Sequence, residues 1–481
     1  MVNLYQGFTK ERTGDMKGKS WIQRGFEGFM WGGILGLVLP AIAVAQAPNS
    51  VTYAKDVAPI LQENCQRCHR EGSVAPMTLL TYEDARSFAP LIKYNVENRF
   101  MPPWPLDVGV GIQHFQNDPS LTNDEIETIV QWVDAGAPLG DQADLLPNPV
   151  FPGWGSEWTF QDELGREPDV IITSPGYTVR ANGMDQWPNL YPVEMTPELG
   201  ITGERWVRAV ELRPAKPEFY GVFHHGSARV INRMAEDVHQ GPGTHQPPPE
   251  VRASQRDQLA EAAVGVKGAI YPEGTGRLLK EGDQVLFNPH FYPARLSEDL
   301  EDVALQVGVW LYPEGETPYP TEGDVVFDQT SMPGMEDNPL IIPPNSQAIY
   351  KTAFRLEGNA KVHSLRGHMH LLGGYNILEV LYPDGRYELL NKLDWDQRWH
   401  TQFIYEEDAQ PLLPEGTTIM ITTIFDNTEN NGQNPDPDQW VLGRSRTVDE
   451  MWRLRVGMTF YSDEDFARLV SDRDGKPMAM R

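Results

Sequence analysis

Apolar and polar residues alternate with a period of two through much of the chain beyond about residue 165. In segment 301–312 (EDVALQVGVWLY) the apolar positions are Val303, Leu305, Val307, Val309 and Leu311. This spacing is typical of a strand with one buried face. Segment 376–390 predicts two strands around a Pro-Asp-Gly turn, and segment 416–427 predicts another strand. Helical periodicity is nearly absent in this part of the chain, apart from a short polar piece at 252–264.

The region before residue 143 has apolar residues at helical spacing instead. Segment 82–97 predicts a helix. Segment 122–136 predicts another, because it begins with a capping box from Thr122 to Glu125 and ends at a glycine. The apolar positions of this second helix are Ile126, Ile129, Val130 and Val133.

A Pro- and Gly-rich stretch at 145–155 separates the helical pattern from the strand pattern. We therefore predict a multidomain fold class. It consists of a small all-α domain at 48–142, a linker at 143–160 and two all-β domains of the jelly-roll or β-sandwich type. We place these β domains at 161–328 and 329–481.

The first 45 residues have the features of a secretory signal peptide. Lys17, Lys19 and Arg24 precede the apolar run 29–44, and small residues suited to cleavage follow near Ala45. A retained membrane anchor is the alternative, although the run is short and contains a proline. We expect an exported, periplasmic protein that is soluble after cleavage.

Composition narrows the classes of function and partner. The 43 Gly and 40 Pro are dispersed among the 481 residues, which favours a loop-rich β protein over a disordered one. A net charge of −28 argues against nucleic acid and anionic membrane surfaces as partners. A basic protein partner is compatible with this charge.

The only two cysteines lie in one motif, Cys65-x-x-Cys68-His69. Two thiols at this spacing can form thioethers to haem, and the adjacent histidine can serve as the proximal iron ligand. A redox dithiol and half of a zinc site are the alternatives, but a zinc ribbon needs a second cysteine pair. The motif therefore predicts a covalently bound c-type haem.

The sixth ligand of this haem has three candidates: Met77, Met101 and His114. Met77 follows the haem motif too closely to reach the opposite face of the haem with ease. Met101 follows a predicted helix and leads into a rigid Pro-Pro turn. We favour Met101.

Histidines and one methionine form further candidate sets. His368 and His370 have the same parity in a strand, so both can chelate one metal. Met451 falls outside the apolar face of its own segment, where a thioether is unexpected unless it is a ligand. The adjacent pair His224 and His225 would point to opposite faces of a flat strand.

These ligand types differ in the metal that they favour. Three imidazoles suit zinc, copper or iron, whereas two imidazoles with a thioether favour copper that can remain Cu(I). His290, after the apolar run 285–287, supplies a further imidazole. The chain thus offers one nitrogen-rich site and one softer copper site.

In their order along the chain, these motifs resemble the copper type II, ascorbate-dependent monooxygenases, the family of peptidylglycine α-hydroxylating monooxygenase and dopamine β-monooxygenase. The resemblance covers residues from about 165 to 465 and includes the Asp- and Asn-rich run at 425–440. Segment 67–105, with its Met-Pro-Pro-Trp motif, is similar to the cytochrome c domain fused to bacterial copper monooxygenases. That similarity also favours Met101 as the sixth haem ligand.

The resemblance implies two copper ions with different roles. His224, His225 and His290 would bind the electron-transfer copper, which requires the His224–His225 segment to turn. His368, His370 and Met451 would bind the catalytic copper, where O2 is used to hydroxylate a substrate C–H bond. The two β domains would face each other across a solvent-filled cleft. Electrons would pass from the haem to the three-His copper and on to the His-His-Met copper.

The expected partners are O2, a small organic substrate and an external electron donor, either a basic redox protein or a small reductant. Arg366 and Arg455 are candidates for binding an anionic substrate, or else are surface charges. Arg455 stands where the amidating enzymes have a tyrosine, so a peptide carboxyl terminus is not supported as the substrate. The alternative function is an electron-transfer or copper-binding cytochrome without oxygenase turnover.

Overall fold

The computed structural model describes residues 51–474 except 71–74, 76, 148, 150–157, 182–184, 232–257, 264–265, 294–295, 322, 329–339 and 445. The predicted signal peptide lies outside the described residues. No helix among the described residues has the length and apolar character needed to cross a membrane.

The first β region contains the strands that carry the adjacent histidine pair. Its strands are β2 (Val170–Thr173), β3 (Tyr177–Val179), β4 (Val193–Glu194), β5 (Glu204–Pro214), β6 (Phe223–Ile231), β7 (Gln258–Ala262), β8 (Gly268–Ile270), β9 (Thr275–Lys280), β10 (Gln284–Phe291), β11 (Leu300–Val303), β12 (Leu305–Leu311) and β13 (Tyr319–Pro320). One sheet has the order β4-β10-β6-β7, and a second has the order β13-β9-β5-β12-β2 with β8 beside β5. Apolar side chains from both sheets share one buried cluster, so the two sheets pack face to face.

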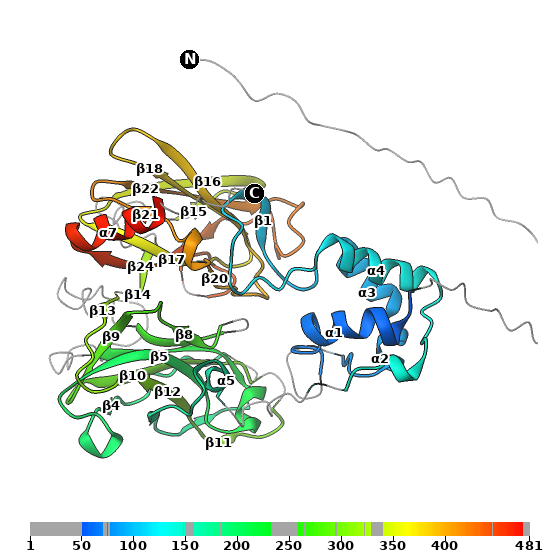
Figure 1. The fold of residues 1–481 in the computed structure, drawn as a ribbon, viewed down its shortest axis with the longest axis horizontal. Helices are drawn as coiled ribbons and strands as arrows, with labels where there is room; N and C mark the ends of the chain where they lie inside the picture. Colours follow the sequence, from blue (N-terminus) through cyan, green and yellow to red (C-terminus); the bar gives the residue numbers. More distant parts are fainter. Residues whose placement is uncertain are drawn as a thin grey trace, which may run out of the picture. The chain divides into compact units, whose positions relative to one another are not determined.

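The second β region contains the His-x-His motif and Met451. Its strands are β14 (Gly323–Asp328), β15 (Ile341–Ile342), β16 (Ser346–Arg355), β17 (Asn359–His368), β18 (Gly373–Leu381), β19 (Tyr387–Asp394), β20 (Phe403–Ile404), β21 (Leu412–Leu413), β22 (Thr418–Asn427), β23 (Val441–Leu442) and β24 (Arg453–Tyr461) (Figure 1). The order β19-β18-β22-β16 makes one sheet and β14-β24-β17-β20 makes the other. A shared apolar cluster again lies between them.

The helices are concentrated in the earliest described residues. They are α1 (Ala58–Asn64), α2 (Tyr82–Ser87), α3 (Ala89–Glu97), α4 (Asn123–Asp134), α5 (Phe160–Leu164) and α7 (Asp463–Asp474). Single turns of other helix types lie at Tyr53–Val57 (η1), Gln142–Asp144 (η2), Pro197–Leu199 (η3), Pro217–Gly221 (η4) and Glu407–Ala409 (η6). The capping box predicted at Thr122 and Glu125 is confirmed. The single helix predicted at 82–97 is divided at Phe88, just before Pro90.

The predicted fold class is wrong, because the described part of the chain is mostly β-sheet and contains no separate small all-α domain. Strand β1 (Leu106–Gly111) lies within the range predicted to be all-α, yet it pairs with β19 at the edge of a C-terminal sheet. Phe115 bridges to Tyr405 and stacks on its ring at 4.9 Å. Residues 50–481 accordingly form one compact unit.

The physical reason is that segment 106–115 carries the apolar side chains that the C-terminal core needs. Leu106 and Phe115 belong to the same buried cluster as the strands of that core, and Trp104 packs against it. Burial against a distant sheet therefore overrides the local helical context. The helical piece predicted at 252–264 is also wrong over its described residues, since Gln258–Ala262 is strand β7.

Candidate metal centres

A β-bulge brings His224 and His225 to one place without a turn. Along β6 and β10, His225 lies opposite His290, but the next pair is Phe223 with Phe291. His224 is therefore the extra residue of the bulge, where two residues on one strand oppose one on its partner. The expectation that this segment turns is wrong, because the bulge alone breaks the alternation of faces.

The three imidazoles of this site converge on a small volume. His290 Nδ1 lies 3.2 Å from His224 Nδ1 and 3.0 Å from His225 Nε2. One nitrogen of each ring lies within 4.8 Å of the other two, and this is the one such group of His, Cys, Asp or Glu ligands found among the described residues. Nitrogens bound to one tetrahedral ion at about 2.0 Å are about 3.3 Å apart. The three donors thus fit a single ion.

Burial keeps these imidazoles in the neutral form that a metal ligand requires. Burial lowers the pKa of His225 to about 3, with further lowering from the neighbouring His290 and His224. Burial, together with His224, also lowers the pKa of His290 to about 3. His224 is the most exposed of the three, and burial lowers its pKa as well.

The far side of His290 faces two further side chains. Its Nε2 lies 3.6 Å from Asp185 Oδ1. Among the described residues, neither of these atoms has a hydrogen-bond partner. Trp187 stacks on the His290 ring at 4.5 Å between centroids, although 54% of this tryptophan is exposed. A carboxylate behind a ligand histidine orients the ring and raises its basicity.

The second candidate set is assembled at the ends of β17 and β24. His368 ends β17, His370 follows two residues later, and the two rings lie 5.5 Å apart at 87°. Met451 stands two residues before β24 and is 8% exposed. The next residues, Trp452 and Leu454, enter the apolar core as predicted, whereas Met451 is not part of that cluster.

Glu450 ties the two halves of this set together. Its side chain accepts hydrogen bonds from the backbone N–H groups of His370 (2.9 Å), Leu372 (2.7 Å) and Met451 (3.0 Å). Burial raises the pKa of Glu450 to about 8, against the lowering effect of these N–H groups. His370 Nδ1 also contacts the Asp449 carbonyl at 3.0 Å, which leaves Nε2 as its donor to a metal.

His400 lies between the two sets. Its ring centroid is 5.1 Å from that of His368 and 6.3 Å from that of His225. Trp395 packs against both His368 and His400 and donates a 2.8 Å hydrogen bond to the His370 carbonyl. The expected solvent-filled cleft is thus bridged by ring contacts at this point.

Arg366 and Arg455 are engaged by a carboxylate from the first β region. Glu261 Oε2 lies 2.8 Å from Arg366 Nη2 and 2.8 Å from Arg455 Nη1. Both arginines are buried. They are therefore not surface charges.

The Cys-x-x-Cys-His motif forms one turn after α1. The N–H groups of Cys68 and His69 both donate to the Cys65 carbonyl. His69 Nδ1 contacts the Met77 carbonyl at 3.3 Å, which leaves Nε2 as the donor that a haem iron requires. The cysteines are not joined in a disulfide, and burial raises the pKa of Cys65 to about 12. These residues fit a covalently bound haem.

Of the candidate sixth ligands, His114 has a backbone contact with the C-terminal β region. Its carbonyl accepts a hydrogen bond from Glu406 N–H at 3.0 Å. Met101 follows α3, and its N–H lies 3.4 Å from the Asn95 carbonyl. The preference for Met101 stays a prediction.

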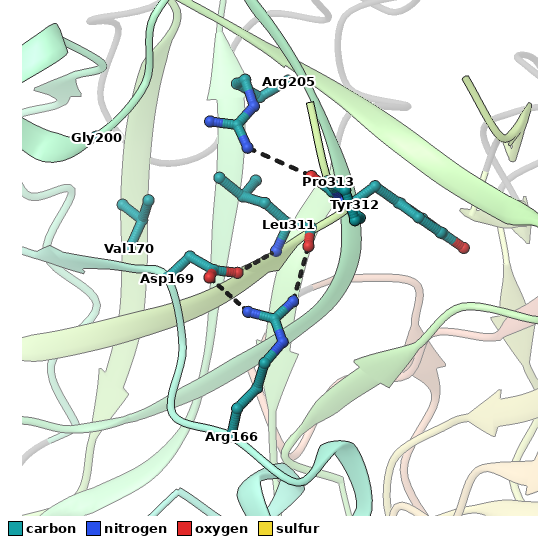
Figure 2. A pocket seen from close by; sticks show the side chains of 8 residues that line it. All are labelled: Arg166, Asp169, Val170, Gly200, Arg205, Leu311, Tyr312 and Pro313. Carbon is teal, nitrogen blue, oxygen red and sulfur yellow. Dashed lines mark hydrogen bonds and ion pairs between the residues drawn. The ribbon is translucent and has the colours of Figure 1, made fainter. Parts of the chain in front are cut away.

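A pocket in the first β region lies apart from these residues (Figure 2). Arg166 donates to Asp169 and to the Leu311 carbonyl, and Asp169 accepts from Leu311 N–H. Arg205 donates to the Tyr312 carbonyl. The polar groups at its rim thus bond to one another, and the pocket has no metal-ligand set.

The sequence interpretation missed four residues at the candidate centres: Asp185, Glu261, His400 and Glu450. Glu450 carried a detectable signal, because a carboxylate beside a candidate ligand in a buried segment needs hydrogen-bond donors. His400 carried a weaker one, as one of only eleven histidines. Asp185 and Glu261 contact residues that are distant in the sequence. The sequence around each of them does not indicate those contacts.

Neither a protein-family model nor a curated protein sequence matches this chain. Among solved structures, the major capsid protein P2 of bacteriophage PM2 is similar at 10% identity over 61% of this chain and 98% of that one, with a TM-score of 0.22. The infectious bursal disease virus VP2 subviral particle is similar at 8% identity over 63% and 74%, with a TM-score of 0.17. A mutant of Bacillus subtilis oxalate decarboxylase is similar at 9% identity over 65% and 88%, with a TM-score of 0.13. Likeness at this level carries no argument about function.

Proposed function

We propose that this protein is an exported monooxygenase that binds two copper ions and a c-type haem and hydroxylates a C–H bond of a small organic substrate with O2. The observation that carries the proposal is the convergence of three imidazole nitrogens from His224, His225 and His290, two of the contacts being 3.0 and 3.2 Å. Support also comes from the nearby His368, His370 and Met451, a softer set that favours copper.

When bound, copper would supply the one-electron redox chemistry that O2 requires, and the haem would supply electrons. His224, His225 and His290 would hold one copper through neutral nitrogens. His368 and His370 would hold the other through imidazoles, with the Met451 thioether as the soft ligand. Cys65, Cys68 and His69 would hold the haem.

The residues around these donors set their positions. The bulge at His224 fixes two rings of the first set on one face. Glu450 fixes the backbone on both sides of the second set through three N–H groups. His400 and Trp395 pack beside His368, with their ring centroids 5.1 and 5.6 Å from that of His368.

Metal content tests the proposal directly. Copper-reconstituted protein is expected to contain two coppers and one haem per chain, measured by elemental analysis and by haem absorbance. One copper per chain, or zinc retained at one ion per site after competition with copper, contradicts the proposed metal content.

The rate of haem oxidation separates a monooxygenase from an electron-transfer cytochrome. Reduced, copper-loaded protein is mixed with O2 and a panel of C–H compounds, and haem oxidation is followed by absorbance. We expect fast, substrate-dependent haem oxidation in the intact protein and slow oxidation in His224→Ala and in copper-free protein. Equal rates in all three favour the cytochrome without oxygenase turnover.

A further inference from the structure

Arg366 and Arg455 face each other directly across two paired strands. They are opposite residues in the register of β17 and β24. Like charges at directly opposite positions of a strand pair repel each other. The pair therefore requires an anion, and Glu261 supplies one from β7.

The contact of Glu261 with both arginines is partly buried. Exposure is 6% for the Arg366 side chain, 11% for Arg455 and 19% for Glu261. Gln258, on the same strand as Glu261, accepts a hydrogen bond from Arg455 Nη1 at 2.5 Å and donates one to Glu261. Burial alone would raise the pKa of Glu261, but the two arginines hold it below its ordinary value. Glu261 is therefore a carboxylate in this cluster.

This cluster adjoins both candidate metal sets. Arg366 lies two residues before His368 on β17, and Arg455 lies four residues after Met451. Glu261 is paired with Ser227, two residues beyond His225 on β6. The arginines next to the His368, His370 and Met451 set thus already have a carboxylate partner.

We infer that Glu261 occupies the arginine pair as an internal carboxylate and excludes carboxylate ligands from it, so that the substrate of the His368, His370 and Met451 set is an organic molecule that no carboxylate anchors to these arginines. The part of this inference that concerns a substrate rests on the proposed function, whereas the occupancy of the arginines by Glu261 does not.

Energetics favour the internal partner over a free one. Carboxylate and guanidinium groups form strong charge-assisted hydrogen bonds, and Glu261 has this chemistry within the folded chain. A free carboxylate that displaced it would leave Glu261 buried without its cations, which is strongly unfavourable. Removal of the Glu261 carboxylate turns the same arginines into an anion site.

The test uses copper-free, full-length protein and two small carboxylates, acetate and benzoate, in isothermal titration calorimetry. Glu261→Ala is expected to bind at least one of them saturably, at least tenfold more tightly than the unmodified protein. Acetamide and benzamide, which lack the charge, are expected to bind no better to the variant. Adding Arg455→Ala to Glu261→Ala should abolish the gain.

Glu211→Ala is the matched control. Glu211 is also buried, and its carboxylate accepts hydrogen bonds from the N–H groups of Thr159 and Phe160. Its removal should create no carboxylate binding. Circular dichroism verifies folding, and Glu261→Gln replaces Glu261→Ala if the alanine variant does not fold.

Two outcomes overturn the inference. Equal binding of carboxylates by the unmodified protein and the variant means that Glu261 does not exclude them. Absence of binding in both folded Glu261 variants means that the arginines do not form a carboxylate site at all. Because the assay uses no copper and no turnover, neither outcome depends on whether the protein is a monooxygenase.

Discussion

The three-His set draws its donors from two adjacent strands of one sheet, whereas the His-His-Met set draws its donors from two strand ends. In the first set, backbone register and one bulge already place nitrogens 3.0 and 3.2 Å apart. In the second set, the His368 and His370 ring centroids lie 5.5 Å apart, against 4.8–5.1 Å between the ring centroids of the first set, and the buried Glu450 side chain holds the backbone around them. The first is a preformed ligand cage fixed by strand pairing, and the second is held by one side chain that joins two strand ends.

This difference predicts different sensitivities of the two sets. The first set should depend mainly on its own ligands, and the second on the residue that joins its halves.

Glu450→Ala should therefore have the largest effect of any single change outside the ligands. It leaves three buried backbone N–H groups without their acceptor, and each buried donor left unsatisfied costs about 1–3 kcal/mol. We expect a loss of about 3 kcal/mol or more in the free energy of unfolding, measured by chemical denaturation. We also expect the copper content to fall from two ions to one.

Glu211→Ala is the control for loss of a buried carboxylate. It should destabilise the protein but leave both coppers bound, because Glu211 bonds to Thr159 and Phe160 and not to a ligand segment. If Glu450→Ala retains both coppers at unchanged affinity, the carboxylate does not position the second set.

Met451→Ala should abolish substrate hydroxylation while most copper stays bound. Two imidazoles remain at the site, but the soft ligand that favours Cu(I) is gone. The measurements are copper content and substrate-dependent oxygen uptake. His290→Ala is the comparison variant, and it should perturb only the other copper. Normal turnover in Met451→Ala would show that the thioether is not a ligand.

The sequence predicted strands better than it predicted how segments meet. Alternation in segment 301–312 correctly placed Leu305, Val307 and Val309 in a core. The same reasoning assigned 106–115 to a helical domain, because the pattern of one segment does not reveal a partner strand nearly 300 residues away.

The candidate sites show the same limit. The alternation of faces along a regular strand predicted that His224 and His225 point to opposite faces. The bulge that brings them together cannot be derived from that alternation. Glu261 is likewise an ordinary acidic residue in the sequence. Its role depends on arginines more than 100 residues away that tertiary packing brings to it.

Asp185→Asn should weaken copper binding at the three-His set by about 10-fold, the lower end of the 10- to 100-fold effect of losing a hydrogen-bonded partner behind a ligand histidine, because Asp185 acts on His290 through its charge and not through a hydrogen bond. The carboxylate lies 3.6 Å from His290 Nε2, on the side of the ring away from the other imidazoles. An amide carries no charge to support the ring. Titration against a Cu(I) chelator measures the change, and the copper at the second set serves as the internal control. An equal loss at both coppers would indicate a general structural defect instead.

Trp187→Ala should have the smallest effect, and this effect should be confined to copper affinity at the three-His set. The indole stacks on His290 at 4.5 Å and 19°, and such aromatic pairs contribute about 0.5–1.5 kcal/mol, equivalent to about a 2- to 12-fold change in affinity. Because 54% of Trp187 is exposed, its removal leaves little buried cavity, and global stability should barely change.

Trp187→Phe keeps an aromatic face over the imidazole and should retain most of the copper affinity. The chelator titration used for Asp185 measures both variants, while denaturation verifies the stability. A Phe variant as weak as the Ala variant would mean that the stack does not orient His290, and the preformed cage would then depend on the bulge and Asp185 alone.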